Sequence, residues 1–236
     1  MIPASTRSRA AILNTLRQGL ARTPLFVDEP PARPASLPVP PPGPQPAGAP
    51  GGQDAWERLA EALAPLEVRP RLARTAGEAV RHLADIAREC GAKSYTRWDE
   101  ALDALDLPGG FDAALAGLAR LPAGPCPGLA QADLGVVLAH AALLESGSIA
   151  VVAAPGRHRA ASLLPPCSVV LVPRSSLLPD VSHLPGLFAR HADPDGRLPS
   201  CLNLITGPSS TADIELVLVR GVHGPARLEL VCLDWL

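Results

Sequence analysis

The apolar stretch LGVVLA, residues 134–139, decides the fold class of this chain. An uninterrupted apolar run of this length predicts a strand buried on both faces, as in the parallel sheets of α/β proteins. Four more runs of strand length follow it, at residues 148–154, 168–173, 202–206 and 227–233. Residues 134–139 and 148–154 are too close for a helical crossover, so we expect them to pair antiparallel or to form a bent ribbon.

Strands and helices alternate in the preceding part of the chain. Thr75 and Glu78 have the spacing of a capping box, which predicts a helix from there to about Cys90. Pro70 places a neighbouring strand at a sheet edge, since proline donates no ladder hydrogen bond. The other predicted elements are strands over 67–72 and 92–98, and helices over 54–64, 99–105, 182–190 and 211–219. This rhythm indicates an α/β fold with a mixed, largely parallel sheet covered by helices.

Composition divides the chain into three predicted segments. Residues 1–22 contain an amphipathic helix over 5–21. Residues 23–53 are rich in proline, which excludes a helix or a central strand and predicts a solvated linker, with a ligand for SH3-type modules as the alternative. Residues 54–236 form the predicted α/β domain, and Asp54 is the expected N-cap of its first helix.

The overall composition bounds the function. A formal net charge of −2 gives no reason to expect nucleic-acid binding, which requires a basic surface. No stretch reaches the roughly 20 apolar residues of a membrane span. No signal peptide is visible either, so we expect a soluble, cytoplasmic protein.

The cysteines predict free thiols in a reducing compartment. They are odd in number and none forms a CxxC pair, which argues against a disulfide framework, a zinc site or an iron–sulfur cluster. They stand at Cys90, Cys126, Cys167, Cys201 and Cys232. No other spacing matches a standard metal site, so we expect no metal on this chain.

Polar motifs interrupt the apolar C-terminal half. Glu145 follows an apolar run and could transfer protons from a partly dry cleft, or could pair with an arginine. Arg157, Arg159 and Ser162 stand in one loop, where two guanidinium groups could bind a carboxylate or phosphate, or serve as surface charges.

A second pair of motifs follows near the end of the chain. The segment GPSSTADIE predicts the start of a helix, which its side chains could cap or which could bind an anion. Its candidate ligand-binding residues are Gly207, Ser209, Thr211, Asp213 and Glu215. In the turn GVHGP, residues 221–225, His223 could act as an acid, base or donor, or could stabilise the turn.

Together these motifs resemble the LUD domain of the lactate-utilization protein C (LutC/YkgG) family. The resemblance rests on ESGS at 145–148, RAASLLP at 159–165, GPSSTADIE at 207–215 and GVHGP at 221–225, in this order. It departs at Ser210, where the family usually has arginine. The resemblance implies a three-layer fold of the NagB/RpiA/CoA-transferase type and a role in oxidising L-lactate to pyruvate. It also implies two iron–sulfur partner proteins that carry the clusters, with no cofactor on this chain.

Three functional hypotheses follow. The first is a subunit of a lactate-oxidising complex. The second is an enzyme of the wider fold acting on a phosphorylated, CoA-linked or folate-like anion, with Glu145 as acid, base or nucleophile. The third is a module that senses a small carboxylate. A shared site requires Glu145, Arg159, Ser209, Asp213 and His223 to converge on one cleft.

Overall fold

The computed structural model describes residues 11, 13–15, 18, 53–122, 127–212 and 218–236. Contacts divide the chain into two units, Met1–Val39 and Pro40–Leu236. The described residues of the first unit are helical and exposed, as expected within 5–21. Apart from Gln53, the predicted linker over 23–53 lies outside the described residues.

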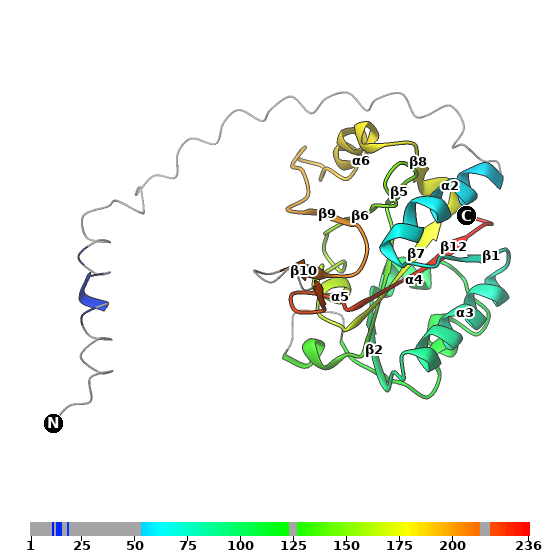
Figure 1. Ribbon diagram of the computed structural model, residues 1–236, viewed down its shortest axis with the longest axis horizontal. Coiled ribbons are helices and arrows are strands. Elements are labelled where there is room, and N and C mark those ends of the chain that lie inside the picture. Colours follow the sequence, from blue (N-terminus) through cyan, green and yellow to red (C-terminus); the bar gives the residue numbers. More distant parts are fainter. Residues whose placement is uncertain (1–10, 12, 16–17, 19–52, 123–126, 213–217) are drawn as a thin grey trace. The chain divides into compact units, whose positions relative to one another are not determined.

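The second unit is built on a six-stranded sheet in which every pair of neighbours is parallel (Figure 1). Its order is β1-β12-β7-β4-β2-β3. The strands are β1 (Arg71–Ala73), β2 (Ser94–Arg97), β3 (Ala119–Arg120), β4 (Leu134–Leu138), β7 (Cys167–Pro173) and β12 (Arg227–Leu233). The interior strands β4, β7 and β12 are buried along most of their length, and β1 is at an edge. The predicted α/β class and largely parallel sheet are therefore confirmed.

A second sheet has four strands in the order β8-β5-β6-β9. They are β5 (Ala141–Leu143), β6 (Ile149–Val152), β8 (Leu177–Leu178) and β9 (Leu202–Ile205). The chain passes from β4 to β5 through Ala139 and His140, and so changes sheets within two residues. The expected pairing of 134–139 with 148–154 was wrong, because β6 pairs instead with β5 and β9.

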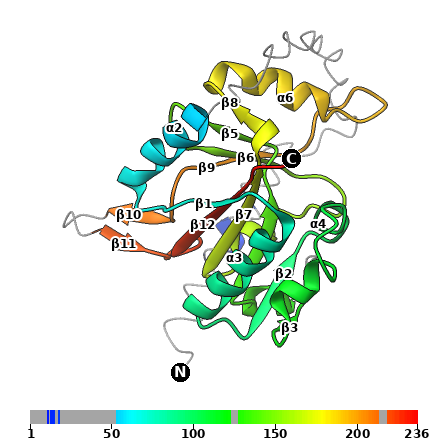
Figure 2. The ribbon, with the colours of Figure 1, turned by 90° about the vertical axis from the view of Figure 1, so that its right-hand side faces the viewer.

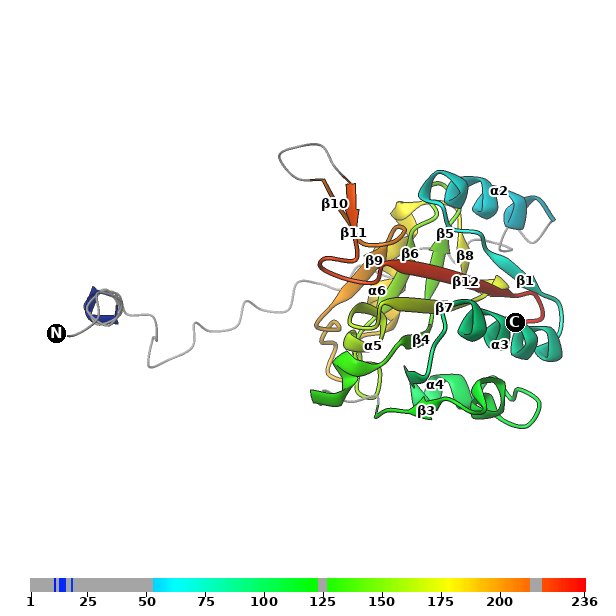
Figure 3. The same ribbon diagram turned by 60° about the horizontal axis from the view of Figure 1, so that its bottom comes forward.

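Helices cover both sheets. Helix α3 (Ala76–Glu89) lies on one side of the six-stranded sheet, and the four-stranded sheet and α2 (Gln53–Leu63) lie on the other (Figure 3). Helix α6 (Leu184–Arg190) covers the outer face of the four-stranded sheet, where Leu184 and Leu187 join a small apolar cluster (Figure 2). The remaining helical segments are α4 (Asp99–Asp103), α5 (Ala160–Leu163), and the 3-10 turns η1 (Ala64–Leu66), η2 (Phe111–Leu115), η3 (Pro127–Gln131), η4 (Arg174–Ser176) and η5 (Val181–His183).

Local signals explain where these helices begin. The hydroxyl of Thr75 accepts a hydrogen bond from the Glu78 N–H at 3.2 Å, so the predicted cap of α3 is present. The Glu78 carboxylate accepts a hydrogen bond from the backbone N–H of Arg74 at 2.7 Å. Helix α2 begins at Gln53, so Asp54 lies within the helix and the prediction that it is the N-cap was wrong. No described helix is long and apolar enough to cross a membrane.

Helix α5 lies directly on β4 because residue 135 is glycine. A Cβ at Gly135 would stand 1.9 Å from the carbonyl oxygen of Ala161, which no side chain tolerates. Leu134 precedes it on β4 and is paired in register with Cys167 of β7. Since neighbouring residues of a strand face opposite sides, α5 and Cys167 lie on opposite faces of the sheet.

The predicted helix over 211–219 was wrong. Two antiparallel strands, β10 (Ser210–Ala212) and β11 (Leu218–Arg220), stand there instead, and residues 213–217 lie outside the described part. The Ser209 N–H donates to the Pro225 carbonyl at 2.8 Å, and the Ser209 carbonyl accepts from the Gly221 N–H at 2.9 Å. These hydrogen bonds hold the segments that precede β10 and follow β11 side by side, so the backbones of β10 and β11 pair with each other.

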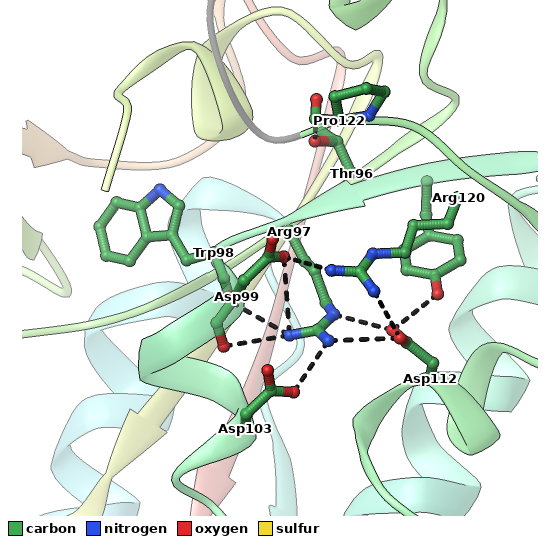
Figure 4. A network of polar contacts seen from close by, with 9 residues as sticks. Thr96, Arg97, Trp98, Asp99, Asp103, Asp112, Arg120 and Pro122 are labelled. Carbon is green, nitrogen blue, oxygen red and sulfur yellow. Dashed lines mark hydrogen bonds and ion pairs between the residues drawn. The ribbon is translucent and has the colours of Figure 1, made fainter. Parts of the chain in front are cut away.

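A network of ion pairs and hydrogen bonds connects β2 to the segments around it (Figure 4). The buried guanidinium of Arg97 lies 2.8 Å from both Asp103 and Asp112. Arg120 of β3 also binds Asp112 at 2.8 Å and Asp99 at 2.7 Å. Two guanidinium groups thus share three carboxylates, which makes this network a structural tie between β2, α4, η2 and β3.

Candidate functional site

A cavity of about 600 Å³ opens at one end of strands β6 and β9. Its walls are the loop that follows β6 and the loop between α6 and β9. Its charged lining is mostly basic: Arg157, Arg159 and Arg197, with His158 and His191, stand against the single carboxylate of Asp193. We refer to this cavity as the basic pocket.

Local backbone geometry places Arg157 at the pocket. Ala154 and Arg157 form an isolated antiparallel bridge, and Gly156 between them has a φ of 74°, in the left-handed region that glycine adopts freely. This tight loop turns the guanidinium of Arg157 back toward His140, whose Nε2 lies 3.0 Å from Arg157 Nη1.

Two hydrogen-bond donors approach the ring of His140, which can accept only one hydrogen bond when it is neutral. The Val152 N–H donates to His140 Nδ1 at 3.2 Å, while Arg157 approaches the other ring nitrogen. A neutral imidazole has one acceptor nitrogen, whereas a backbone N–H and a guanidinium are donors only. One donor at this half-buried position therefore lacks an acceptor, and an anion with free oxygen atoms would supply one.

Neighbouring aromatic rings pack against His140, and its burial favours the neutral imidazole. The ring centroid of His191 lies 4.7 Å from that of His140, and the buried Trp98 lies 6.0 Å away, both edge to face. Trp98 is itself fixed by a 3.0 Å bond from its indole N–H to the His158 carbonyl. Burial, and then the nearby His191 and Arg157, lowers the pKa of His140 to about 4. The same causes, burial first and then Arg157, lower the pKa of His191.

The arginines of the pocket are unequally paired. The guanidinium of Arg197 lies 3.2 Å from the Asp195 carboxylate, and the backbone N–H of Arg197 donates to the Asp193 carboxylate at 2.8 Å. Among the residues that the structure describes, neither Arg157 nor Arg159 forms an ion pair. Their charge remains available to a ligand, and a carboxylate or phosphate is the chemical group that guanidinium binds best.

Comparison with known proteins assigns this part of the chain. The family model described as the LUD domain matches residues 128–233. Residues 128–233 are therefore similar to the LUD domain. The basic pocket lies within these residues, as do all four polar motifs found in the sequence.

Curated relatives match the same part of the chain. The uncharacterized protein YkgG of Escherichia coli K12 is 47% identical over 97 residues, which are 41% of this chain and 42% of the relative. Lactate utilization protein C of Halalkalibacterium halodurans is 44% identical over 97 residues, with the same shares. The protein of that name from Bacillus subtilis is 38% identical, over 41% of this chain and 40% of its own. The chain thus matches under half the length of these relatives.

A solved structure shares the fold over a longer range. A DUF162 family protein from Deinococcus radiodurans superposes with a TM-score of 0.53 and 20% identity, covering 76% of this chain and 96% of its own. The similarity therefore extends beyond the LUD domain match and supports the α/β architecture of the larger unit.

The structure places the predicted site residues in separate regions. Arg157 and Arg159 line the basic pocket. Glu145 is exposed in the turn after β5, where its N–H binds the Pro179 carbonyl at 3.1 Å. That turn meets the other end of β6 and β9 through a 2.7 Å bond between the hydroxyls of Ser148 and Thr206. The length of β6 therefore separates Glu145 from the arginines.

The other predicted residues that the structure describes do not line the pocket. Ser162 is buried and its hydroxyl donates to the Arg159 carbonyl at 2.9 Å, which stabilises the start of α5. Gly207 has a φ of 85° and packs against Leu66. Thr211 lies in β10, opposite Val219. Asp213 and Glu215 lie outside the described residues.

The last two motifs do meet each other. His223 is exposed in its turn, and the next residue, Gly224, packs against Ser209 and α5: a Cβ there would lie 3.2 Å from the Ser209 Cβ. Ser209 and His223 thus belong to one contact region, Arg159 to the basic pocket and Glu145 to a third place. The expected convergence on one cleft does not occur among the described residues.

Sequence reasoning missed two residues that line the pocket, His191 and Arg197, and also His140, which contacts Arg157. His140 directly follows the predicted central strand, at the position where the ends of parallel strands gather ligand-binding groups in α/β folds. That position was the signal available. His191 and Arg197 stand in a loop without a motif, and only the tertiary structure brings them to β6.

Proposed function

We propose that this protein takes part in the oxidation of L-lactate to pyruvate, and that its basic pocket binds a small carboxylate. The proposed carboxylate binding rests on the unmatched donor beside His140, together with Arg157 and Arg159, which have no ion-pair partner among the described residues. A carboxylate is acceptor-only when ionised and satisfies both features. The names of the relatives support the pathway.

In this proposal the protein works in the cytoplasm as a subunit with two iron–sulfur proteins, which carry the clusters. The scattered cysteines, without CxxC pairs, support placing the clusters on the partners. An enzyme that uses Glu145 on an anion held by Arg157 gains no support, because those residues occupy opposite ends of β6.

Calorimetric titration of the full chain with L-lactate, pyruvate and the neutral analogue lactamide tests the pocket. We expect both acids to bind and lactamide not to bind. Arg157→Met should weaken acid binding roughly 10- to 100-fold, since a hydrogen bond to a charged group contributes about 1.5–3 kcal/mol. The matched control is Arg88→Met, an exposed arginine paired with Asp85 on α3. Equal affinities for wild type and Arg157→Met would refute the pocket assignment.

A separate experiment tests the pathway. A strain lacking this gene should grow poorly on L-lactate as sole carbon source, and affinity purification from the parent strain should recover two cluster-bearing proteins. Normal growth of the deletion strain on L-lactate, or purification without such proteins, would refute the subunit role whatever the pocket binds.

A further inference from the structure

Two cysteines far apart in sequence lie in contact in the fold. Cys90 is the C-cap of α3 and Cys167 opens β7, and their Sγ atoms are 3.0 Å apart. A disulfide bond measures about 2.0 Å between sulfurs, so a movement of about 1 Å would close it. Gly91 follows Cys90 with a φ of 62° and open space around it, which lets the end of α3 make that small shift.

The two thiols differ in access. Cys167 is 4% exposed and belongs to the main apolar core, whereas Cys90 is only partly buried. A cavity of about 530 Å³ lies beside them, lined among others by Glu89, which precedes Cys90, and by Arg227, which is paired in register with Cys167. Cys90 is the more exposed of the two thiols, so a small reagent in solution reaches it before Cys167.

The surroundings also favour a thiolate at Cys90. Its contact with Cys167 is the main influence that lowers the pKa of Cys90, and Arg227 adds to it against the opposing effect of burial. The same contact, followed by burial, raises the pKa of Cys167. A thiolate near solvent beside a protonated, buried thiol is the arrangement of an attacking and a resolving cysteine.

We propose that Cys90 and Cys167 form a reversible disulfide when the protein meets a peroxide. The Cys90 thiolate attacks one peroxide oxygen, the O–O bond breaks, and hydroxide leaves, which gives a sulfenic acid at Cys90. The sulfur of Cys167 then attacks Cys90 Sγ, the S–O bond breaks and water forms with the Cys167 proton. Overall, two thiols and one hydrogen peroxide give one disulfide and two waters.

The bond would tie the end of α3 to the first residue of a central strand. Those points are 77 residues apart in sequence, so the cross-link closes a long loop of the unfolded chain and should stabilise the oxidised protein. This consequence does not depend on the ligand of the basic pocket, which lies elsewhere in the domain.

Peptide mapping of the native full chain by mass spectrometry, after treatment with hydrogen peroxide, tests the proposal. We expect a cross-linked Cys90–Cys167 peptide lacking two hydrogen atoms, which dithiothreitol separates. In Cys167→Ser, dimedone should trap a sulfenic acid at Cys90. In Cys90→Ser, Cys167 should stay reduced because it is buried.

The matched control is Cys201→Ser. Cys201 is partly buried like Cys90 but contacts Asn203 at 3.1 Å rather than a thiol, so this variant should cross-link as the wild type does. Wild-type protein in which Cys90 proceeds to the sulfinic acid, or pairs with another cysteine, would overturn the proposal. The wild-type map decides the question even if a core serine at position 167 prevents folding.

Discussion

At the scale of single residues, the side chains at the basic pocket have surroundings that the sequence alone does not reveal. Arg157 and Arg159 were predicted as ligand-binding residues because paired guanidinium groups in one loop are recognisable locally, and the structure places both on the basic pocket. His140 was missed because its partners, Arg157 and His191, come from segments that lie beside it only after folding.

Gly135 is a residue whose replacement has a calculable steric effect. In Gly135→Ala the new methyl would overlap the Ala161 carbonyl and push α5 away from β4. We expect the free energy of unfolding to fall by about 1–3 kcal/mol or more, as for overpacked cores, in urea denaturation. Gly128→Ala serves as control because open space surrounds that glycine. Equal stability of the two variants would contradict the close approach.

His140 predicts a pH dependence of stability. Its pKa is about 4 in the folded state against an ordinary 6.5, so at intermediate pH the unfolded chain binds a proton that the native protein does not. Stability from this residue is therefore fully present above about pH 6.5 and declines as the pH falls toward 4. Urea denaturation between about pH 5 and 7 should show this slope, and His140→Gln should reduce it.

Urea denaturation of wild type and His140→Gln over the same pH range provides the comparison. An unchanged slope in His140→Gln would show that other groups cause the pH dependence. His191, whose pKa is also lowered, contributes with the same sign, so the slope should shrink in His140→Gln rather than vanish.

At the scale of elements, apolar runs predicted the sheet better than polar motifs predicted its connections. β12 (Arg227–Leu233) has the predicted bounds, because its second half, residues 230–233, is continuously apolar and only Arg227 and Glu229 interrupt the first half. The hairpin β10–β11 was mistaken for a helix because GPSSTADIE combines good cap residues with an acidic first turn. The bonds from Ser209 to Pro225 and Gly221 decide otherwise, and such long-range pairing leaves no local signature.

The Arg97 network makes a prediction about how elements are held together. Arg97→Met would remove the buried guanidinium that binds Asp103 and Asp112, so we expect a loss of about 1.5–3 kcal/mol in the free energy of unfolding, the range of hydrogen bonds to charged groups. Arg120→Met, whose side chain is 42% exposed, should cost about 1 kcal/mol or less. Chemical denaturation followed by circular dichroism measures both. A larger loss for Arg120→Met than for Arg97→Met would refute the central role of Arg97.

At the scale of the whole molecule, the α/β class followed from periodicity and the lactate-utilization resemblance from the order of four motifs. The division into two sheets could not be predicted. The apolar residues from Leu134 to Leu144 are continuous in sequence, yet the chain crosses between layers at Ala139 and His140. A hydrophobic pattern indicates that a residue is buried but not which neighbour buries it, so the contact of His140 at that crossing with Arg157 of the pocket could not be predicted.

The position of β12 has a consequence for biosynthesis. This strand is the last of the sheet in sequence but lies between β1 and β7. While a ribosome is still translating the chain, β1 has no hydrogen-bonding neighbour in this sheet and one side of β7 stays open until residue 233 has left the exit tunnel. The nascent protein therefore presents unpaired strand edges, which are sites of aggregation, until β12 is inserted between β1 and β7.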